Sequence, residues 1–343
     1  MNLLTIVVPS YNSAAYLGRA LDSLLGSMEA LDVIVVNDGS SDATAEVAAT
    51  YVERYPEHIR LFNKENGGHG SGVNLGMREA RAPWFKILDS DDRLDPDGLA
   101  ALLDVLRGFS EQEPRPELVV SDFCYEIHRI KNGEEKIYER EADYSNVFKP
   151  DSMNSWSRMR SFKIDQLLMM HALCYRTDLL YKIRLRLPEK TYYEDNVFVL
   201  EPLPHVRRIY YLHKSVYRYF IGRQDQSVNF ASLLKNVHMQ ITVTLELFRR
   251  ISLESVRPQR LQRYMYRHMS RMVAMCIIPL AVEGTPEARA RIMTLWEELV
   301  NINPAAAKKL KASPILNLQK ILTSTGATFN ERVYNLMSKV FVL

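Results

Sequence analysis

Short apolar runs alternate with helical stretches over about the first 120 residues, and this alternation limits the possible folds more than any other feature. The runs, rich in branched side chains, are Leu4 to Val8, Val33 to Val36, Ile59 to Phe62, Phe85 to Leu88 and Leu118 to Val120. Three segments between them have helical spacing: Ala15 to Leu25, Ala43 to Tyr55 and Ser71 to Ala80. Strands alternating with helices predict an α/β domain whose largely parallel sheet is covered on both faces. Ligands bind such sheets at the carboxyl ends of the strands, so the residues that follow each run are the candidates for a site.

The alternation weakens in the middle of the chain and gives way to a purely helical pattern. Lys131-Asn132-Gly133 predicts a hairpin turn, and the pattern from Ala231 onward is helical, with breaks at prolines 258, 286, 304 and 314. The chain has 343 residues, more than the roughly 250 to 300 at which single cores stop growing. We therefore expect an α/β domain over residues 1–230 and a helical C-terminal region over residues 231–343.

Charge, hydropathy and cysteine usage limit the partners and the compartment. The net charge of +3, without a basic run, predicts no nucleic-acid partner. The longest apolar run, Met272 to Val282, contains Pro279 and is shorter than the about 18 to 20 residues that span a bilayer. Cys124, Cys174 and Cys276 lack C-x-x-C spacing and lie in apolar stretches, which predicts buried thiols in a reducing compartment. We expect a cytoplasmic protein.

Polar loops follow the first two predicted strands. Pro9-Ser10-Tyr11-Asn12 follows the first, and Asn37-Asp38-Gly39-Ser40-Ser41-Asp42 follows the second. An aromatic ring in such a loop can stack on a nucleobase, and a carboxylate can accept its N–H. The alternative is turn and helix-cap chemistry, with Asp42 or Ser41 capping the next helix. Together the two loops predict a nucleotide pocket.

A glycine-rich loop, Asn66 to Gly72, follows the third strand and opens a helical stretch that contains Asn74. Glycines let the backbone approach a ligand closely, and a helix N-terminus suits phosphate, so Gly68 and Asn74 are predicted to line the nucleotide pocket. A dinucleotide fingerprint would follow the first strand, and a P-loop would continue with Gly-Lys-Ser/Thr, so neither applies. His69 is interpreted as a loop residue, because no second histidine lies at ligand spacing.

The most specific feature is Asp89-Ser90-Asp91-Asp92, which ends the apolar run Trp84 to Leu88. Three carboxylates in four residues repel one another unless a cation or hydrogen bonds compensate them. A divalent ion such as Mg²⁺ or Mn²⁺ takes one or two carboxylates and completes its shell with water and substrate phosphate oxygens. The alternative is a solvated acidic turn that caps the helix near Pro96. The strand before the motif and the loops upstream favour a metal.

Three segments, taken in this order, resemble the family 2 glycosyltransferases with the GT-A fold. They are Thr5 to Asn12, Val33 to Asp42 and Leu88 to Asp92, and the similarity is continuous over about residues 3 to 100. The resemblance implies an inverting transferase that uses a divalent metal and a nucleoside-diphosphate-sugar donor, most commonly UDP-linked. The implied donor-site residues are Pro9, Tyr11 and Asp38 around the base, Asp89 near the ribose, and Asn12 and Ser90 in the same segments. The implied metal ligands are Asp91 and Asp92.

Two later segments are similar to the same family. Glu194-Asp195, before the apolar run Val197 to Leu200, looks like its Glu-Asp motif, which implies Asp195 as the general base with Glu194 beside it. From the residues alone, paired carboxylates that open a helix are first a favourable dipole interaction of about 0.3 to 1 kcal/mol. The same dipole would keep a carboxylate ionised to accept a hydroxyl proton. Tyr217 to Ser227 is similar to a loop that closes over the diphosphate, with Arg223 as a forked donor to the leaving phosphate.

The chain lacks the Gln-x-x-Arg-Trp motif of processive synthases. We therefore expect transfer of a single sugar to a hydroxyl of a glycan or lipid-linked acceptor, in cell-surface polysaccharide biosynthesis. Two alternatives stay open: a sugar-phosphate nucleotidyltransferase and a non-catalytic sugar-nucleotide-binding protein.

Four arginines fall on one face of a predicted C-terminal helix: Arg260, Arg263, Arg267 and Arg271. Met265, Met269, Met272 and Cys276 fall on another. Such a basic amphipathic helix suits either peripheral contact with anionic lipid at the inner face of the membrane or packing on the protein with a solvated arginine face.

Overall fold

The computed structural model describes residues 2–110, 114–131, 134–222, 230–313 and 316. The chain divides into two compact units, one of Met1–Ser161 with Leu168–Gln224 and one of Phe162–Leu167 with Asp225–Leu343. The first unit is α/β and the second is helical, so the predicted fold class is confirmed. The segment Phe162–Leu167, which the sequence analysis left in the first domain, groups with the helical unit.

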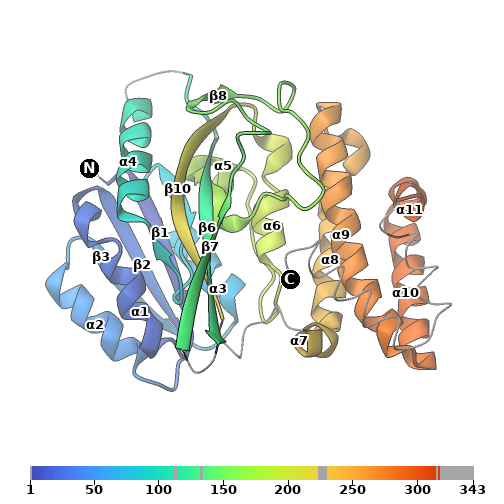
Figure 1. Ribbon diagram of the computed structural model, residues 1–343, viewed down its shortest axis with the longest axis horizontal. Coiled ribbons are helices and arrows are strands. Elements are labelled where there is room, and N and C mark those ends of the chain that lie inside the picture. The colour runs from blue at the N-terminus through green and yellow to red at the C-terminus, as the bar shows by residue number, and fades with distance from the viewer. Residues whose placement is uncertain (1, 111–113, 132–133, 223–229, 314–315, 317–343) are drawn as a thin grey trace. The chain divides into compact units, whose positions relative to one another are not determined.

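A ten-stranded sheet forms the centre of the first unit (Figure 1). Its order is β3-β2-β1-β4-β9-β6-β10-β5, with β7 paired to β6 and β8 paired to β10. The strands are β1 (Leu4–Ser10), β2 (Leu31–Asp38), β3 (Ile59–Lys64), β4 (Trp84–Ile87), β5 (Arg93–Leu94), β6 (Leu118–Lys131), β7 (Glu134–Ala142), β8 (Ser152–Asn154), β9 (Leu173–Arg176) and β10 (Ile209–Ile221).

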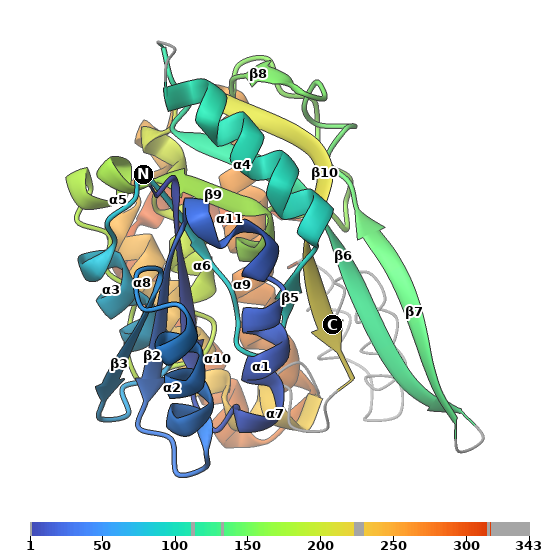
Figure 2. The same ribbon diagram turned by 90° about the vertical axis from the view of Figure 1, so that its left-hand side faces the viewer.

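The sheet is parallel in its first half and mixed in its second. Neighbours β3, β2, β1 and β4 are all parallel, as the alternating pattern predicts. Strand β10 is parallel to β6, whereas β5, β7, β8 and β9 run antiparallel to their partners. The prediction of a largely parallel sheet therefore describes the half that the motifs cover. The predicted hairpin is confirmed by the long antiparallel ribbon of β6 and β7 (Figure 2).

Burial explains why the parallel half reads as unbroken apolar runs. Every residue of β1 and β2 is buried, so both faces of these strands need apolar side chains. Helix α3 packs closely on β1, because a Cβ at Gly76 would lie 2.1 Å from a methyl carbon of Val7. The helices of this unit are α1 (Ala14–Asp22), η1 (Leu25–Ala30), α2 (Thr44–Arg54), α3 (His69–Glu79), α4 (Pro96–Ser110), η2 (Met170–Ala172), α5 (Thr177–Lys182), α6 (Asp195–Leu200) and η3 (Leu203–His205).

Three of the four predicted proline breaks, at residues 258, 286 and 304, lie where helices of the second unit begin, and Pro314 lies outside the described residues. Pro286 and Pro304 open α10 and α11, and the side chains of Thr285 and Asn303 cap them by accepting from the amides of Ala288 and Ala306. The helices are α7 (Phe230–Lys235), α8 (Val237–Arg250), η4 (Leu253–Ser255), α9 (Gln259–Glu283), α10 (Pro286–Ile302) and α11 (Pro304–Lys311). Among the helices described, none is long and apolar enough to span a membrane.

The predicted arginine face of α9 is interrupted. Arg260 and Arg263 are exposed, but Arg267 is half-buried and donates hydrogen bonds to the carbonyl oxygens of Phe162 and Gln166. Arg271 is only 3% exposed. The expectation of four arginines on one accessible face is wrong, because the segment Phe162–Leu167 packs on this part of the helix. The methionine and cysteine face is buried, as predicted.

Candidate active site

The loops after β1 and β2 meet at the carboxyl edge of the sheet, as expected for neighbouring parallel strands. Asn12 adopts a left-handed backbone with φ of 48°, and its side-chain oxygen accepts from the amide of Ser41 at 2.8 Å. The hydroxyl of Ser40 accepts from the amide of Asn12 at 3.0 Å. Tyr11 remains 54% exposed beside this clasp. The two loops, Pro9–Asn12 and Asn37–Asp42, are therefore hydrogen-bonded to each other, and the aromatic ring of Tyr11 is exposed to solvent beside them. We call these two loops the rim.

The capping interpretation of the second loop is confirmed at Asp42, whereas a nucleotide-binding role for Asp38 stays a prediction. One carboxylate oxygen of Asp42 accepts from the amide of Thr44, and the other accepts from the amide of Ala14. These bonds tie the starts of α1 and α2 together, and the two helices lie side by side (Figures 1 and 2). Asp42 is thus a structural part of the rim.

Asp38 is buried and holds the glycine-rich loop. Its carboxylate accepts from the amides of Gly67 and Gly68 at 2.9 and 2.7 Å, and from Lys64 Nζ at 2.6 Å. The side chain of Asn66 donates to the Asp38 carbonyl oxygen at 2.9 Å. Three donors already surround this carboxylate, so its contribution to a nucleotide site includes fixing the loop beside it.

The segment that carries Glu194 and Asp195 packs against the glycine-rich loop. The Gly67 carbonyl accepts from the amide of Lys190 at 2.6 Å. A Cβ at Gly70 would lie 2.2 Å from the carbonyl oxygen of Pro188, so only glycine allows this approach.

Two of the predicted donor-site residues, Gly68 and Asn74, face the same segment. Gly68 has φ of 83° and lies against Lys190, where a Cβ would come within 3.1 Å of the backbone nitrogen. Asn74 accepts from the amide of Leu187 at 2.8 Å and donates to the carbonyl of Leu187 at 2.9 Å. Both residues therefore contact the segment before Glu194, and their role in donor binding stays a prediction.

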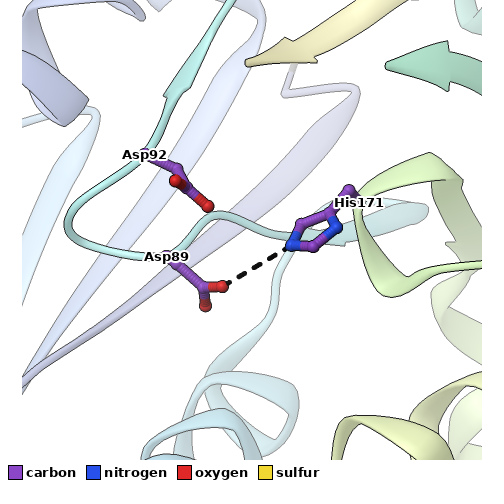
Figure 3. Close-up of side chains that lie close together, drawn as sticks. All are labelled: Asp89, Asp92 and His171. Atoms are coloured by element: carbon purple, nitrogen blue, oxygen red, sulfur yellow. Dashed lines mark ion pairs between the residues drawn. The ribbon is translucent and has the colours of Figure 1, made fainter. Parts of the chain in front are cut away.

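The acidic turn after β4 places Asp89 and Asp92 beside His171, which no motif pointed to (Figure 3). One side-chain ligand atom from each of the three lies within 4.8 Å of the others. Asp92 is 1% exposed and accepts from the hydroxyl of Tyr217 at 2.6 Å and from the amide of Phe220 at 2.8 Å. Asp89 faces His171, with 3.9 Å between carboxylate oxygen and Nε2.

Asp91 and Ser90, the other members of the turn, have different surroundings. Asp91 is partly buried, and its backbone carbonyl accepts from Arg19 at 2.7 Å. Within the described residues, the Asp91 side chain does not join the group formed by Asp89, Asp92 and His171. The Ser90 hydroxyl shares a hydrogen bond of 2.7 Å with Ser13.

Burial and mutual repulsion perturb these carboxylates in opposite directions. Burial raises the pKa of Asp92 well above its usual value, and the negative charges of Asp91 and Asp89 raise it further. Burial also acts to raise the pKa of Asp89, but the neighbouring His171 and His69 outweigh it and lower the pKa. One carboxylate is thus held ionised and the other resists ionisation, an arrangement often found at functional sites.

His69 joins the acidic turn to the Glu194 segment. Its Nδ1 lies 2.7 Å from a carboxylate oxygen of Glu194, and its Nε2 lies 2.9 Å from a carboxylate oxygen of Asp89. Burial would lower the pKa of His69, but these two hydrogen bonds raise it well above 6.5. The two carboxylates thus favour the protonated form of this imidazole.

Asp195 is the first residue of α6 and is partly buried. Asn196 donates to it at 3.1 Å. Burial, followed by the charge of Glu194, raises the pKa of Asp195 to about 7. The expectation that the helix dipole keeps this carboxylate ionised is wrong in direction, because burial and the adjacent carboxylate dominate over a helix of six residues. The pKa lies where a general base is most useful near neutral pH.

A divalent cation fits this group of residues. Asp89 and Asp92 offer carboxylate oxygens, the repulsion that raises the Asp92 pKa is what a cation would relieve, and His171 adds an imidazole. Within the described part of the chain, the buried Nδ1 of His171 has no hydrogen-bond partner. Metal binding is thus compatible with the donor set.

Several residues of the site were missed from sequence. His69, His171 and Tyr217 touch the acidic groups, and Lys86 donates to the carbonyl of His171 at 2.6 Å from below. Burial lowers the pKa of Lys86 to about 8. The one available signal was a histidine inside a glycine-rich loop at a strand end. Arg223, predicted to meet the leaving phosphate, lies outside the described residues.

The sheet of the first unit has a parallel half and a mixed half, and an acidic turn follows the fourth strand. This arrangement is the GT-A fold of glycosyltransferases. Residues 5–110 match the family model of Glycosyl transferase family 2. The similarity of this segment to family 2 glycosyltransferases favours a glycosyltransferase over the nucleotidyltransferase alternative.

Relatives and solved structures agree with this assignment. A Rickettsia felis protein described as an uncharacterised glycosyltransferase is 36% identical over 114 residues, which are 32% of this chain and only 18% of that protein. The Escherichia coli glycosyltransferase YibD is 26% identical over 242 residues, covering 70% of this chain and 67% of YibD. Residues 1–349 of TarS from S. aureus, solved in complex with UDP-GlcNAc, superpose with a TM-score of 0.68 at 20% identity, covering 97% of this chain and 92% of that one. This last likeness is one of fold.

Proposed function

We propose that the chain transfers a single sugar, with inversion, from a UDP-linked donor to a hydroxyl of a glycan or lipid-linked acceptor in cell-surface polysaccharide biosynthesis. One observation carries the proposal: the acidic turn and the predicted base segment meet on a single imidazole, that of His69. A donor held at Asp89 would thus lie within reach of a base at Asp195. The location we infer is cytoplasmic.

The proposed donor pocket uses the rim after β1 and β2. Tyr11, which is exposed, would stack on the nucleobase, with Pro9 and Asn12 shaping the loop. Asp38 would support the pocket by holding the glycine-rich loop in place. The TarS structure with UDP-GlcNAc supports a uridine donor on this fold.

The proposed metal ligands are Asp91 and Asp92, as the resemblance implies, together with Asp89 and His171, which lie beside Asp92. A bound Mn²⁺ or Mg²⁺ would supply charge neutralisation for the donor diphosphate. Asp89 is the best-placed carboxylate, because it is ionised and faces both His69 and His171.

In the proposed mechanism Asp195 accepts the proton of the acceptor hydroxyl as that oxygen attacks the anomeric carbon. The attack comes from the face opposite the diphosphate, so the new bond forms as the bond to the leaving phosphate breaks. Burial, and after it the charge of Glu194, keeps the pKa of Asp195 near neutrality. Arg223 is proposed to donate to the leaving phosphate.

The test compares Asp195→Asn with Asp97→Asn, which changes an exposed aspartate in the first turn of another helix. An amide keeps the shape but cannot accept the proton. Turnover in Asp195→Asn should fall by about 10² to 10⁴-fold, while donor affinity measured by calorimetry stays unchanged. The Asp97 variant should behave as wild type. Near-normal turnover in Asp195→Asn would move the base assignment to Glu194.

Protein stability provides a folding control for this test. The pKa of Asp195 is raised from 3.8 to about 7 in the folded chain, so its contribution to stability is full below pH 3.8 and is lost as the pH rises through 7. Asparagine removes this ionisation. The melting temperature of Asp195→Asn at pH 8 should therefore not fall below that of wild type.

A further inference from the structure

The geometry points to His69 as a positioning residue that fixes the distance between the donor-side carboxylate Asp89 and the catalytic segment at Glu194. This inference rests on the proposed function, because it assigns those two carboxylates to the two halves of one reaction. His69 does not lie on the reacting atoms. It acts through the groups it holds.

Each ring nitrogen of His69 lies at hydrogen-bond distance from a carboxylate oxygen, and the two carboxylates belong to different residues. The distances are 2.7 Å to Glu194 and 2.9 Å to Asp89, and the two partners are 105 residues apart in the chain. The imidazole ring carries two nitrogens, and each lies at hydrogen-bond distance from a different carboxylate. A glutamine side chain has a single nitrogen, so it cannot place one nitrogen at each of these two positions.

The backbone on both sides of His69 is held by hydrogen bonds. The side chain can therefore set the distance between Asp89 and Glu194. His69 is the first residue of α3, and the two glycines before it are held by the Asp38 carboxylate. The Gly67 carbonyl also binds the amide of Lys190. The imidazole thus extends from a rigid loop that already contacts the base segment.

The base segment needs such a tie. Lys190 and Tyr193 both have left-handed backbones, with φ of 54° and 71°, and Glu194 and Asp195 place two carboxylates side by side near Asp89. Left-handed non-glycine residues are strained, and like charges repel. Without the two hydrogen bonds of His69, this segment should move away from the acidic turn, and Asp195 would no longer be oriented toward the acceptor.

The kinetic test compares His69→Ala and His69→Gln with His238→Ala, which changes an exposed histidine in α8. Removing a residue that orients a functional group typically lowers activity about 10 to 100-fold. We expect kcat to fall by this factor in both His69 variants, while the dissociation constant for UDP-sugar changes by less than about threefold. A kcat equal to that of the His238 control, or a loss of donor affinity that matches the loss of kcat, would overturn the inference.

A double-mutant cycle with Glu194→Gln separates positioning from general destabilisation. Residues that act through one another give effects that do not add. The double variant should have the kcat of the slower single variant within about threefold. Losses that multiply would show that His69 does not act through Glu194.

Amide hydrogen exchange gives a readout that needs no turnover. In His69→Ala the amides of residues 190–196 should exchange faster than in wild type, while those of α2 should not change. Equal exchange in the 190–196 segment would overturn the inference.

Because glutamine retains one of the two hydrogen bonds, the His69→Gln variant can still be measured if the alanine variant unfolds. If Asp195→Asn keeps its turnover, the proposed function fails while the exchange result stands. If only His69→Ala keeps it, the positioning role alone fails.

Discussion

The rim after β1 and β2 and the acidic group around His69 lie at the same edge of the sheet but are built differently. In the rim, acceptors meet donors. Asn12 accepts from Ser41, and Asp38 accepts from the amides of Gly67 and Gly68 and from the ammonium group of Lys64. In the acidic group, carboxylates face carboxylates, and burial raises the pKa of Asp195 to about 7. The rim carboxylates accept hydrogen bonds from nearby donors, whereas Asp195 lies beside a second carboxylate, Glu194, whose charge repels it. Binding and chemistry are thus assigned to different regions.

The largest expected difference between the rim and the acidic group is in how donor affinity and kcat/KM depend on pH. Asp195 must be ionised to accept a proton, and its pKa is about 7. Below that pH the ionised fraction falls tenfold per unit, so kcat/KM at pH 5 should be about 100-fold lower than its plateau. Donor affinity, which depends on the rim, should change far less. Initial rates and calorimetry between pH 5 and 9 check both, and a flat rate profile would contradict the role of Asp195.

A second expected effect concerns the metal. Asp91→Ala should lower the Mn²⁺-dependent affinity for nucleoside diphosphate by about 10 to 100-fold and leave the fold intact. Calorimetry with and without Mn²⁺ measures it. Unchanged metal-dependent affinity would remove Asp91 from the site and leave Asp89, Asp92 and His171, the residues that the structure groups together.

A smaller effect is expected in the rim. Base–aromatic stacking contributes about 1 to 3 kcal/mol, and because Tyr11 is half exposed we expect the lower end. Tyr11→Ala should raise the donor dissociation constant about tenfold and leave kcat at saturating donor unchanged. A fall in kcat without a change in affinity would break the division between binding and chemistry.

The smallest effect concerns the helical unit. Only Arg260 and Arg263 of the predicted arginine face are exposed, so any contact with anionic lipid should be weak and salt-sensitive. Flotation with anionic liposomes at low salt should disappear when both are changed to Gln. Equal flotation with neutral liposomes would rule out a charge-based contact.

Local patterns predicted the rim and the acidic turn, because each lies directly after a strand that the sequence marks. They could not predict His171, which reaches Asp89 only because β9 pairs with β4, joining Phe85 to Tyr175. They also could not predict the bridge at His69, whose partner Glu194 is 125 residues away. For α9, periodicity located the arginines but not the segment that covers Arg267. Contacts between distant segments depend on tertiary packing, which periodicity does not encode.

The anomeric configuration of the product tests the central claim most directly. In the proposed mechanism Asp195 is the one base, and the acceptor attacks from the face opposite the diphosphate. An α-linked donor must therefore give a β-linked product. The coupling constant of the anomeric proton distinguishes the two where the sugar has an axial proton at C2. A large coupling is the predicted result with such a sugar, and a product with retained α configuration would contradict the mechanism.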